Sequence, residues 1–328
     1  MISRYEMCET PLLQTIGLKK YFDVKGCKLH AVDDINISIP RGETLGVVGE
    51  SGCGKSTLGR VILRLLEPTE GKILFNGEDI TTYNKAQMRA MRTKMQIIFQ
   101  DPYSSLNPRM TLADIIAEPM IVTNMYPTRA EIYNRVEKLM DTVGLSKRLL
   151  NVYPHELDGG RRQRVGIART LSVNPEFIVC DEPVSALDVS IQAQILNLLM
   201  DLQQELKLTY MFITHDLSVV NHISNNIAVM YLGQCVETAP SDELFENPLH
   251  PYTKALLEAI PEPDLCMKTK SIKVLKGEVT SPINPKHGCR FAARCDFACE
   301  QCANKPHKLI EVSSGHFVAC PMVTEQFK

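Results

Sequence analysis

Between residues 12 and 48, short runs with the hydrophobic pattern of β-strands alternate with turn signals, and the last run is apolar without a break. The first two runs cover Leu12 to Leu18 and Ala31 to Ile39, and their alternation of apolar and polar residues is typical of half-buried β-strands. The segment from Thr44 to Val48 is apolar almost throughout, as in a strand that is buried on both faces. The pattern therefore predicts a small sheet that leads into a buried strand.

The apolar residues that follow recur at the spacing of an α-helix. Such a helix is predicted from Ser56 to Leu66, and we expect Glu67-Pro68 to end it because the residue before a proline disfavours helical backbone. Residues 103 to 155 are predicted to be mostly helical. The clearest helix in that region runs from Ala130 to Val143, and Gly144 is a typical helix terminator.

Three further apolar runs predict strands that alternate with helices. They cover Met95 to Phe99, Phe177 to Cys180 and Tyr210 to Thr214, and a helix predicted from Ser190 to Leu206 separates the last two. This alternation indicates an α/β fold with a parallel sheet covered on both faces. From Pro261 onward the periodicity is weak, so we expect one domain at residues 11 to 263 and a C-terminal extension at residues 264 to 328.

A phosphate-binding loop is predicted between the buried strand and the first helix. The sequence Gly49-Glu-Ser-Gly-Cys-Gly-Lys-Ser56 fits G-x-x-x-x-G-K-[ST], and the glycines let backbone N–H groups turn toward a phosphate at the helix N-terminus. Lys55 would neutralise the β- and γ-phosphates, Ser56 would bind Mg²⁺ and Thr57 would assist at the α-phosphate. The predicted nucleotide contacts are Gly49, Ser51, Gly52, Gly54, Lys55, Ser56 and Thr57.

Two carboxylates end the apolar strand Phe177-Ile-Val-Cys-Asp-Glu182. The end of a strand places both at the carboxyl edge of a parallel sheet, where open α/β sheets bind ligands. Asp181 suits the Mg²⁺ shell, and Glu182 can polarise the attacking water as a general base. His215 follows a third strand, from which it can donate a hydrogen bond to a γ-phosphate.

These elements occur in the order found in ABC-type ATPases, and the chain resembles that family. Gln100 matches the Q-loop, Leu157-Asp-Gly-Gly-Arg-Arg-Gln-Arg164 the signature, Ser185-Ala-Leu-Asp188 the D-loop and His215 the H-switch. The resemblance implies a P-loop ATPase with a mainly parallel sheet core and an antiparallel β subdomain. It also implies a helical subdomain at about residues 101 to 165 and a small Cys-rich C-terminal extension.

Three segments are similar to the ATP-binding subunits of oligopeptide and dipeptide importers, in particular to the second of their two ATPases. These segments are Ile97 to Arg109, Asp181 to Ser190 and Asn247 to Leu256, within a similarity that runs from about residue 11 to 322. The resemblance implies a peripheral protein on the cytoplasmic face of the membrane. Its partners would be a homologous ATPase subunit in a heterodimer, two transmembrane permease subunits and, indirectly, an extracytoplasmic substrate-binding protein.

In that family each ATP lies between the Walker motifs of one subunit and the signature of the other. The resemblance implies that Tyr21 stacks on adenine, although Phe22 beside it is an alternative and a core aromatic residue is the plain interpretation. Mg²⁺ would be held through Ser56, Gln100 and Asp181. Closure of the pair on ATP and its reopening after hydrolysis would drive the membrane subunits.

The signature departs from the family pattern Leu/Phe-Ser-Gly-Gly-Gln. Here it reads Leu157-Asp-Gly-Gly-Arg161, so that Asp158 and Arg161 flank the retained Gly159 and Gly160. The family serine donates a hydrogen bond to the γ-phosphate on the partner, whereas an ionised Asp158 repels that phosphate. We expect the site completed by this signature to be impaired, unless Arg161 offsets the charge by pairing with Asp158 or by reaching the phosphate.

Five of the eleven cysteines lie within the last 40 positions. Cys289, Cys295, Cys302 and Cys320 have a spacing that resembles the C-terminal region of peptide-importer ATPases, where four cysteines can hold a 4Fe–4S cluster. Cys299 falls outside that spacing. Tetrahedral zinc and a small module of reduced thiols are the alternatives.

Composition limits the remaining function classes. The 36 Lys and Arg against 38 Asp and Glu give a formal net charge of −2, so general nucleic-acid binding is not expected. No apolar run reaches the about 18 residues that cross a bilayer, so we expect a cytoplasmic chain. An importer of nickel or metallophores, a soluble ABC ATPase outside transport and a non-enzymatic ATP or redox sensor are the alternative functions.

Overall fold

The computed structural model describes residues 10–260, 281–285, 287–304 and 307–324. The chain forms two compact units. The first comprises residues up to Ile39, Thr44–Thr81 and the chain from Thr214 onward, and the second comprises Pro40–Glu43 and Thr82–Ile213. The expected boundary near residue 264 lies outside the described residues and remains a prediction.

The first unit contains two sheets. In chain order its strands are β1 (Leu13–Val24), β2 (Cys27–Ile39), β3 (Thr44–Val48), β4 (Glu70–Phe75), β5 (Glu78–Asp79), β9 (Asn226–Tyr231), β10 (Gln234–Pro240), β11 (Ile310–Ser313) and β12 (His316–Val318). Its α-helices are α1 (Lys55–Ile62), α8 (Leu217–Ile223), α9 (Ser241–Glu246), α10 (Pro251–Glu258), α11 (Glu300–Asn304) and α12 (Pro321–Thr324).

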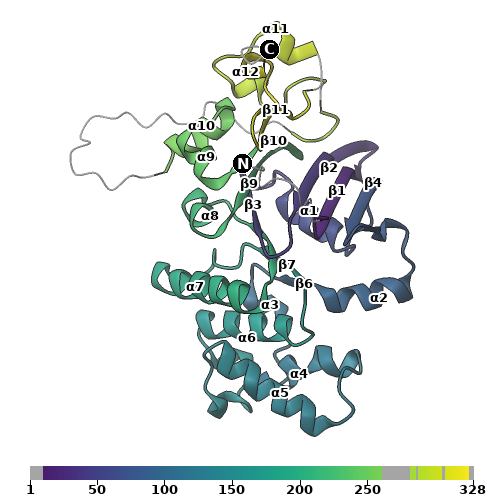
Figure 1. Cartoon of the computed structure of the whole chain (residues 1–328), viewed down its shortest axis with the longest axis vertical. Helices are drawn as coiled ribbons and strands as arrows, with labels where there is room; N and C mark the ends of the chain where they lie inside the picture. Colours follow the sequence, from purple (N-terminus) through teal and green to yellow (C-terminus); the bar gives the residue numbers. More distant parts are fainter. Residues whose placement is uncertain (1–9, 261–280, 286, 305–306, 325–328) are drawn as a thin grey trace, which may run out of the picture. The chain divides into compact units, whose positions relative to one another are not determined.

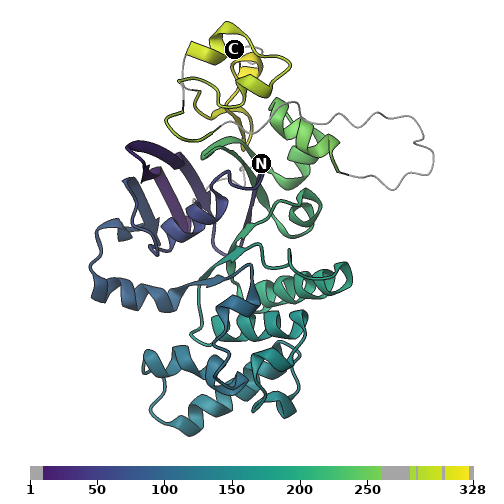
Figure 2. The same cartoon turned by 180° about the vertical axis from the view of Figure 1, so that it is seen from behind.

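One sheet of this unit is antiparallel, with the strand order β2-β1-β4-β5; its strands are seen from behind in Figure 2. The strands of the other sheet within this unit follow the order β11-β12-β10-β9-β3. There β3 pairs with β9 in parallel, with Val48 opposite Val229, whereas the remaining pairs are antiparallel. Because β3 ends in the phosphate loop, this sheet positions that loop.

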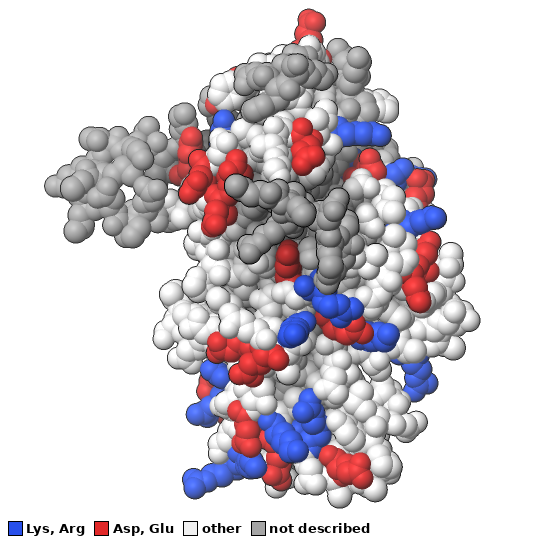
Figure 3. Space-filling model, in the orientation of Figure 1, with Lys and Arg blue, Asp and Glu red and all other residues white. Residues whose placement is uncertain are grey.

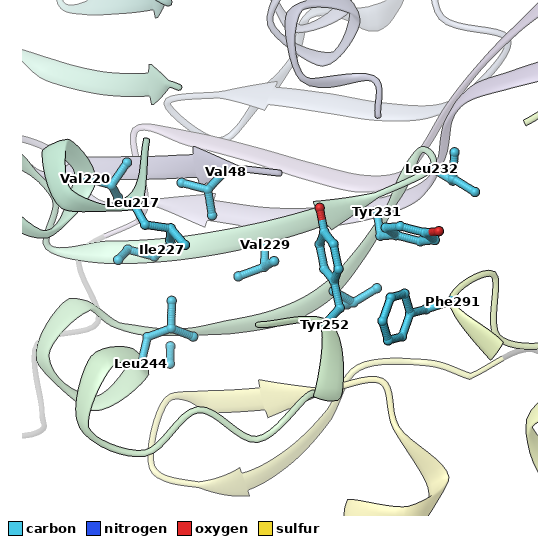
Figure 4. Close-up of a cluster of buried hydrophobic side chains, with 12 residues drawn as sticks. Val48, Leu217, Val220, Ile227, Val229, Tyr231, Leu232, Leu244, Tyr252 and Phe291 are labelled. Atoms are coloured by element: carbon cyan, nitrogen blue, oxygen red, sulfur yellow. The ribbon is translucent and has the colours of Figure 1, made fainter. Parts of the chain in front are cut away.

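A buried cluster joins β3 and β9 to the C-terminal part of the first unit (Figure 4). Val48 and Val229 lie in it beside side chains of α8 and α10. Tyr231, Tyr252 and Phe291 are each at most 2% exposed, and their rings pack edge to face or tilted, with centroids 4.7–5.3 Å apart. Phe291 lies in the cysteine-rich segment, residues 289 to 302. This segment therefore shares a hydrophobic core with β3 and β9, the strands behind the phosphate loop.

The second unit holds a parallel sheet with the order β8-β7-β6 and a group of helices. The strands are β6 (Met95–Ile98), β7 (Phe177–Asp181) and β8 (Thr209–Ile213), and the helices are α2 (Lys85–Lys94), α3 (Pro102–Ser105), α4 (Leu112–Val122), α5 (Arg129–Thr142), α6 (Gly159–Leu171) and α7 (Val189–Leu206). All residues of β7 and β8 are buried. In Figure 1, α4 and α5 lie beside α6, and all three are in contact.

Most elements expected from the hydrophobic pattern are present, but several boundaries are wrong. The strand expected to end at Leu18 continues to Val24, and the strand expected to begin at Ala31 begins at Cys27. The first helix was expected to reach Leu66, but α1 ends at Ile62. Arg64 takes a left-handed backbone with φ 50°, and its guanidinium donates to the carbonyl of Ile80 (2.9 Å) and pairs with Glu67 (2.6 Å). These contacts turn the chain several residues before the proline that was expected to end the helix.

The surface in Figure 3 shows basic and acidic side chains interspersed over the visible face.

No helix among the described residues is both long and apolar enough to span a membrane.

Candidate active site

The phosphate loop connects β3 to α1, and two of its glycines are enforced by close backbone contacts. At Gly49 (φ 151°) a Cβ atom would lie 2.1 Å from the carbonyl oxygen of Met230. At Gly54 (φ 105°) it would lie 2.0 Å from the carbonyl oxygen of Ala31. Both positions therefore require glycine, and the loop is fixed against β9 and β2.

The lysine of the loop is buried within it. Lys55 is 4% exposed, and its Nζ donates hydrogen bonds to the carbonyl oxygens of Gly49 (2.7 Å) and Glu50 (3.0 Å). Ser56 and Thr57 follow in the first turn of α1, where the positive end of the helix dipole favours an anion. Ser51 and Gly52 are exposed on the loop.

Tyr21 belongs to a polar cluster beside the same loop. Its ring stacks on His30, with centroids 3.9 Å apart, and its hydroxyl donates to Asp33. Burial and the hydrogen bond to Asp33 raise the pKa of Tyr21. Phe22 points to the other face of β1, where the ammonium of Lys20 lies 5.1 Å from its ring centroid. The strand alternation thus puts only one of the two aromatic candidates on the face that holds Asp33.

The two predicted carboxylates end β7 in the second unit. Asp181 is buried, and Glu182 follows with a left-handed φ of 47° and an N–H that donates to the carbonyl of Ile213 (2.9 Å). The Nε2 of Gln100 donates to Oε2 of Glu182 at 2.8 Å. The structure therefore brings together the Q-loop glutamine and the expected general base, and it holds the latter in a backbone conformation that is costly for a non-glycine residue.

The D-loop follows β7, and the H-switch follows β8. Ser185 Oγ donates to the carbonyl of Glu182 (3.1 Å), and Asp188 is the exposed N-cap of α7. His215 is exposed after β8, next to Thr214, whose N–H donates to Val47 of β3 at 3.1 Å.

The signature forms the start of α6. Asp158 is its N-cap, because Oδ1 accepts the backbone N–H of Arg161 at 2.8 Å. Nε of Arg161 lies 3.4 Å from Oδ2 of Asp158, and both side chains are exposed. A Cβ at Gly160 would lie 2.7 Å from Ile191 of α7, whereas Gly159 has more room. The carboxylate therefore serves as a helix cap in an exposed ion pair.

The four predicted cluster ligands line one small cavity of about 10 Å³ in the first unit. The N–H of Cys289 donates to the carbonyl of Cys302 (2.7 Å), and burial raises the pKa of Cys289 to about 11. Burial also raises the pKa of Cys295, Cys302 and Cys320. Cys299 does not line the cavity, although its Sγ lies 3.5 Å from that of Cys302. The part of the chain that the structure describes contains no group of three or more His, Cys, Asp or Glu side chains placed to hold a metal ion.

Sequence reasoning assigned no role to two arginines that lie between Cys289 and Cys295. Arg294 contacts Glu50 of the phosphate loop, and Arg290 contacts Asp33 beside Tyr21. The signal that could have drawn attention to them is their position between two predicted cluster ligands.

Two protein families match the sequence of this chain. The family described as ABC transporter matches residues 32–185, and the family described as Oligopeptide/dipeptide transporter, C-terminal region, matches residues 236–302. The oligopeptide transport ATP-binding protein AppF of Bacillus subtilis (strain 168) is 50% identical over 94% of this chain and 96% of its own length. The chain belongs to the oligopeptide and dipeptide ABC transporter family. It is an ABC transporter ATPase.

Two further comparisons support this ABC transporter assignment. The oligopeptide transport ATP-binding protein OppF of Salmonella typhimurium (strain LT2) is 50% identical over 94% of this chain and 95% of its own length. Among solved structures, the ATP-binding cassette MJ0796, a dimer bound to ADP and Pi after hydrolysis, matches with a TM-score of 0.63 and 28% identity, over 70% of this chain and 98% of that one. The ABC ATPase therefore has the family's α/β fold, with a mostly parallel sheet and an antiparallel β subdomain.

Proposed function

We propose that this ATPase energises the import of oligopeptides or dipeptides through a membrane complex. The observation that supports it best is the match to the oligopeptide and dipeptide C-terminal region, together with relatives named for oligopeptide transport that align over nearly the whole chain. The complex would contain a homologous ATPase subunit, two permease subunits and a substrate-binding protein outside the membrane. The chain would lie on the cytoplasmic face.

In the ATP site, each predicted residue has a chemical role that its surroundings support. The buried Lys55 would turn from the loop carbonyls to the β- and γ-phosphates, and Ser56 would bind Mg²⁺ together with Asp181. Glu182 would accept the proton of the attacking water, with Gln100 as its hydrogen-bonded neighbour. His215 would contact the γ-phosphate from the end of its strand.

We further infer a pair of unlike ATPases with one fast and one slow site. A dimeric relative of the cassette fold supports pairing. The signature here has a carboxylate at position 158, where the family has a serine hydroxyl. The ion pair of Asp158 with Arg161 reduces the repulsion between this carboxylate and a phosphate. It does not replace the hydrogen bond that the serine hydroxyl would donate to the phosphate. The fast site would combine the Walker motifs of this chain with the partner's signature, and the slow site would use Asp158.

A transport assay tests the proposed function. The complete complex, encoded with its neighbouring subunits, is reconstituted in proteoliposomes with ATP inside, and uptake of a labelled tripeptide is compared with uptake of a nickel complex. ATP-dependent peptide uptake that disappears when this subunit is omitted supports the proposal. Uptake of nickel alone, or ATPase activity that no membrane partner changes, contradicts it.

We also propose that Cys289, Cys295, Cys302 and Cys320 bind a 4Fe–4S cluster. The four thiols agree in number and type with the ligands of such a cluster. The cavity that they line, about 10 Å³, has room for about one water molecule, and the described side chains are not placed to hold a metal ion, so binding would require them to rearrange. The cluster would cross-link the C-terminal segment. The raised thiol pKa values mean that binding must release protons from the free cysteines.

A further inference from the structure

Arg294 holds the phosphate loop from the cysteine-rich segment. Its Nη1 lies 2.7 Å from Oε2 of Glu50 and its Nη2 lies 3.0 Å from Oε1, which is the two-point geometry of a strong arginine–carboxylate pair. The side chain of Arg294 is only 5% exposed and that of Glu50 is 25% exposed. The hydrogen bonds to Glu50 raise the pKa of Arg294.

A second contact fixes the backbone of the same loop residue. The N–H of Glu50 donates to the hydroxyl of Tyr252 at 2.9 Å. The ring of Tyr252 packs against Phe291, and both contact Tyr231 (Figure 4). Arg294 also lies over the ring of Tyr231, 5.9 Å from its centroid. Side chain and backbone of Glu50 are thus held by one aromatic and cationic cluster.

Arg290 makes the corresponding contact on the side of Tyr21. Its guanidinium pairs with Asp33 and donates to the carbonyl of Leu232, and its side chain is 7% exposed. Burial alone would raise the pKa of Asp33, but hydrogen bonds from Tyr21 and His30 and the charge of Arg290 lower it. Asp33 therefore remains an anion that accepts the Tyr21 hydroxyl.

We propose that the segment from Cys289 to Cys295 positions the nucleotide-binding elements, with Arg294 and Arg290 as its positioning residues. Arg294 would set the conformation of the phosphate loop through Glu50. Arg290 would set the orientation of Tyr21 through Asp33, at the adenine end of the nucleotide. The inference rests on the proposed ATP site.

The physical reason is the charge that the loop carries without its partner. Glu50 is one residue after Gly49, in a loop that must accept a triphosphate of several negative charges. A carboxylate left unpaired there would repel the ligand, and a freed side chain would loosen the loop. Without Arg290, burial of the charged Asp33 would likewise cost more free energy. The carboxylate of Asp33 would then be held less firmly as the acceptor of the Tyr21 hydroxyl.

Both arginines are sequence neighbours of predicted cluster ligands. Arg290 follows Cys289 directly and Arg294 precedes Cys295, while Phe291 anchors the segment between them. A rearrangement of the cysteine cavity would therefore act on Arg294, which contacts the phosphate loop, and on Arg290, which contacts Asp33. The conformation of the segment from Cys289 to Cys295 would thus affect the affinity of the chain for nucleotide.

The test measures binding of three probes to the full chain by calorimetry: ATP, GTP and inorganic tripolyphosphate. R294M is expected to weaken all three by about tenfold, since the phosphate loop is common to them. R290M is expected to weaken ATP by about tenfold and to leave tripolyphosphate within about twofold of the unmodified chain. R148M, which removes an exposed arginine of the second unit, is the matched control and should change none of the affinities.

Two additional variants separate positioning from loss of folding. E50Q/R294M should recover most of the affinity lost in R294M, because no carboxylate is left unpaired. R294K keeps the charge but loses the two-point contact, so it should fold and still bind all three probes less tightly.

Unmodified binding of tripolyphosphate by both R294M and R294K would overturn the role of Arg294. Equal losses of ATP and tripolyphosphate in R290M would overturn the role of Arg290. Failure of the unmodified chain to bind ATP would instead contradict the proposed function itself.

Discussion

The side-chain amide of Gln100 donates a hydrogen bond of 2.8 Å to the carboxylate of Glu182, 82 residues further along the chain. The bond occupies an oxygen of the residue that we propose as the general base. For this oxygen to accept the proton of the attacking water, Gln100 would have to move away or share the hydrogen bond with that water. A motion of the helical segment after β6 would then act on Glu182 through Gln100.

The first prediction concerns this base. E182Q should bind ATP with unchanged affinity and hydrolyse it at least about 100-fold more slowly at the site formed by the Walker motifs of this chain, because the amide keeps the shape and loses the base. Single-turnover hydrolysis in the assembled transporter measures the rate, and calorimetry measures the affinity. An unchanged rate at that site would remove Glu182 from the mechanism.

The second prediction concerns the buried lysine. K55A should lower the affinity for ATP itself by about tenfold or more, because Lys55 would contact phosphate in the ground state and because the loop also loses two hydrogen bonds to its own carbonyls. Equilibrium binding of ATP to the full chain tests it, with the exposed Lys138 replaced in K138A as control. If both variants bind ATP equally well, Lys55 has only a structural role.

The third prediction concerns the signature. This chain alone should be a poor ATPase even at high concentration, since a homodimer would place Asp158 against both nucleotides. D158S/R161Q should raise homodimer hydrolysis by about an order of magnitude or more, the scale of one strong phosphate contact. Asp158 also caps α6, and serine is an equally good cap, so the substitution should not destabilise the helix. Equal turnover by the unmodified chain and the double variant would mean that Arg161 supplies the contact.

The fourth prediction concerns the cysteines. Protein purified without oxygen should absorb broadly near about 400 nm and contain about four irons per chain. Replacing any of Cys289, Cys295, Cys302 or Cys320 by serine should remove the absorbance. C299S should keep it, since Cys299 does not line the cavity. Stoichiometric zinc without iron in such a preparation would replace the cluster with a zinc site.

The fifth prediction concerns pH and the buried pair of His316 and Glu237, which are 2.8 Å apart. Burial alone would lower the pKa of His316, but the hydrogen bond and charge of Glu237, with Glu243 on the other ring nitrogen, raise it. A raised folded-state pKa stabilises the protein fully below the unfolded value of about 6.5, and this stability is lost as pH rises through the folded pKa.

Thermal unfolding between pH 6 and pH 9 measures this effect. The midpoint should fall with rising pH in the unmodified chain and fall less in H316Q, whose amide does not titrate. Identical slopes in the two proteins would show that folding does not raise the pKa of His316.

The sequence predicts best what depends on local pattern. The strand from Thr44 to Val48 is found within the same bounds, and Gly49 and Gly54 of the phosphate loop lie where a close backbone contact requires glycine. The helix α7 begins one residue before its predicted start and ends at Leu206 as expected. These features follow from runs of residues that are adjacent in the chain and need no knowledge of the tertiary structure.

Contacts between distant segments could not be predicted in this way. Arg294 and Glu50 are separated by 244 positions, and neither lies in a pattern that names the other. The ion pair of Glu237 and His316 joins β10 to β12 across 79 positions. The early end of α1 has the same origin, because Arg64 donates to the carbonyl of Ile80, which lies 16 positions further along the chain, beyond β4 and β5.

The pairing of Arg294 with Glu50 also constrains how such transporters can diverge. A related subunit could acquire a foreign C-terminal region by recombination. Whether that region carries an arginine at position 294 would then not depend on the phosphate loop, which is encoded at the other end of the gene. An imported region without that arginine would leave a carboxylate beside the triphosphate. We therefore expect positions 50 and 294 to change together over evolutionary time, so that the two ends of the gene are exchanged as a matched pair.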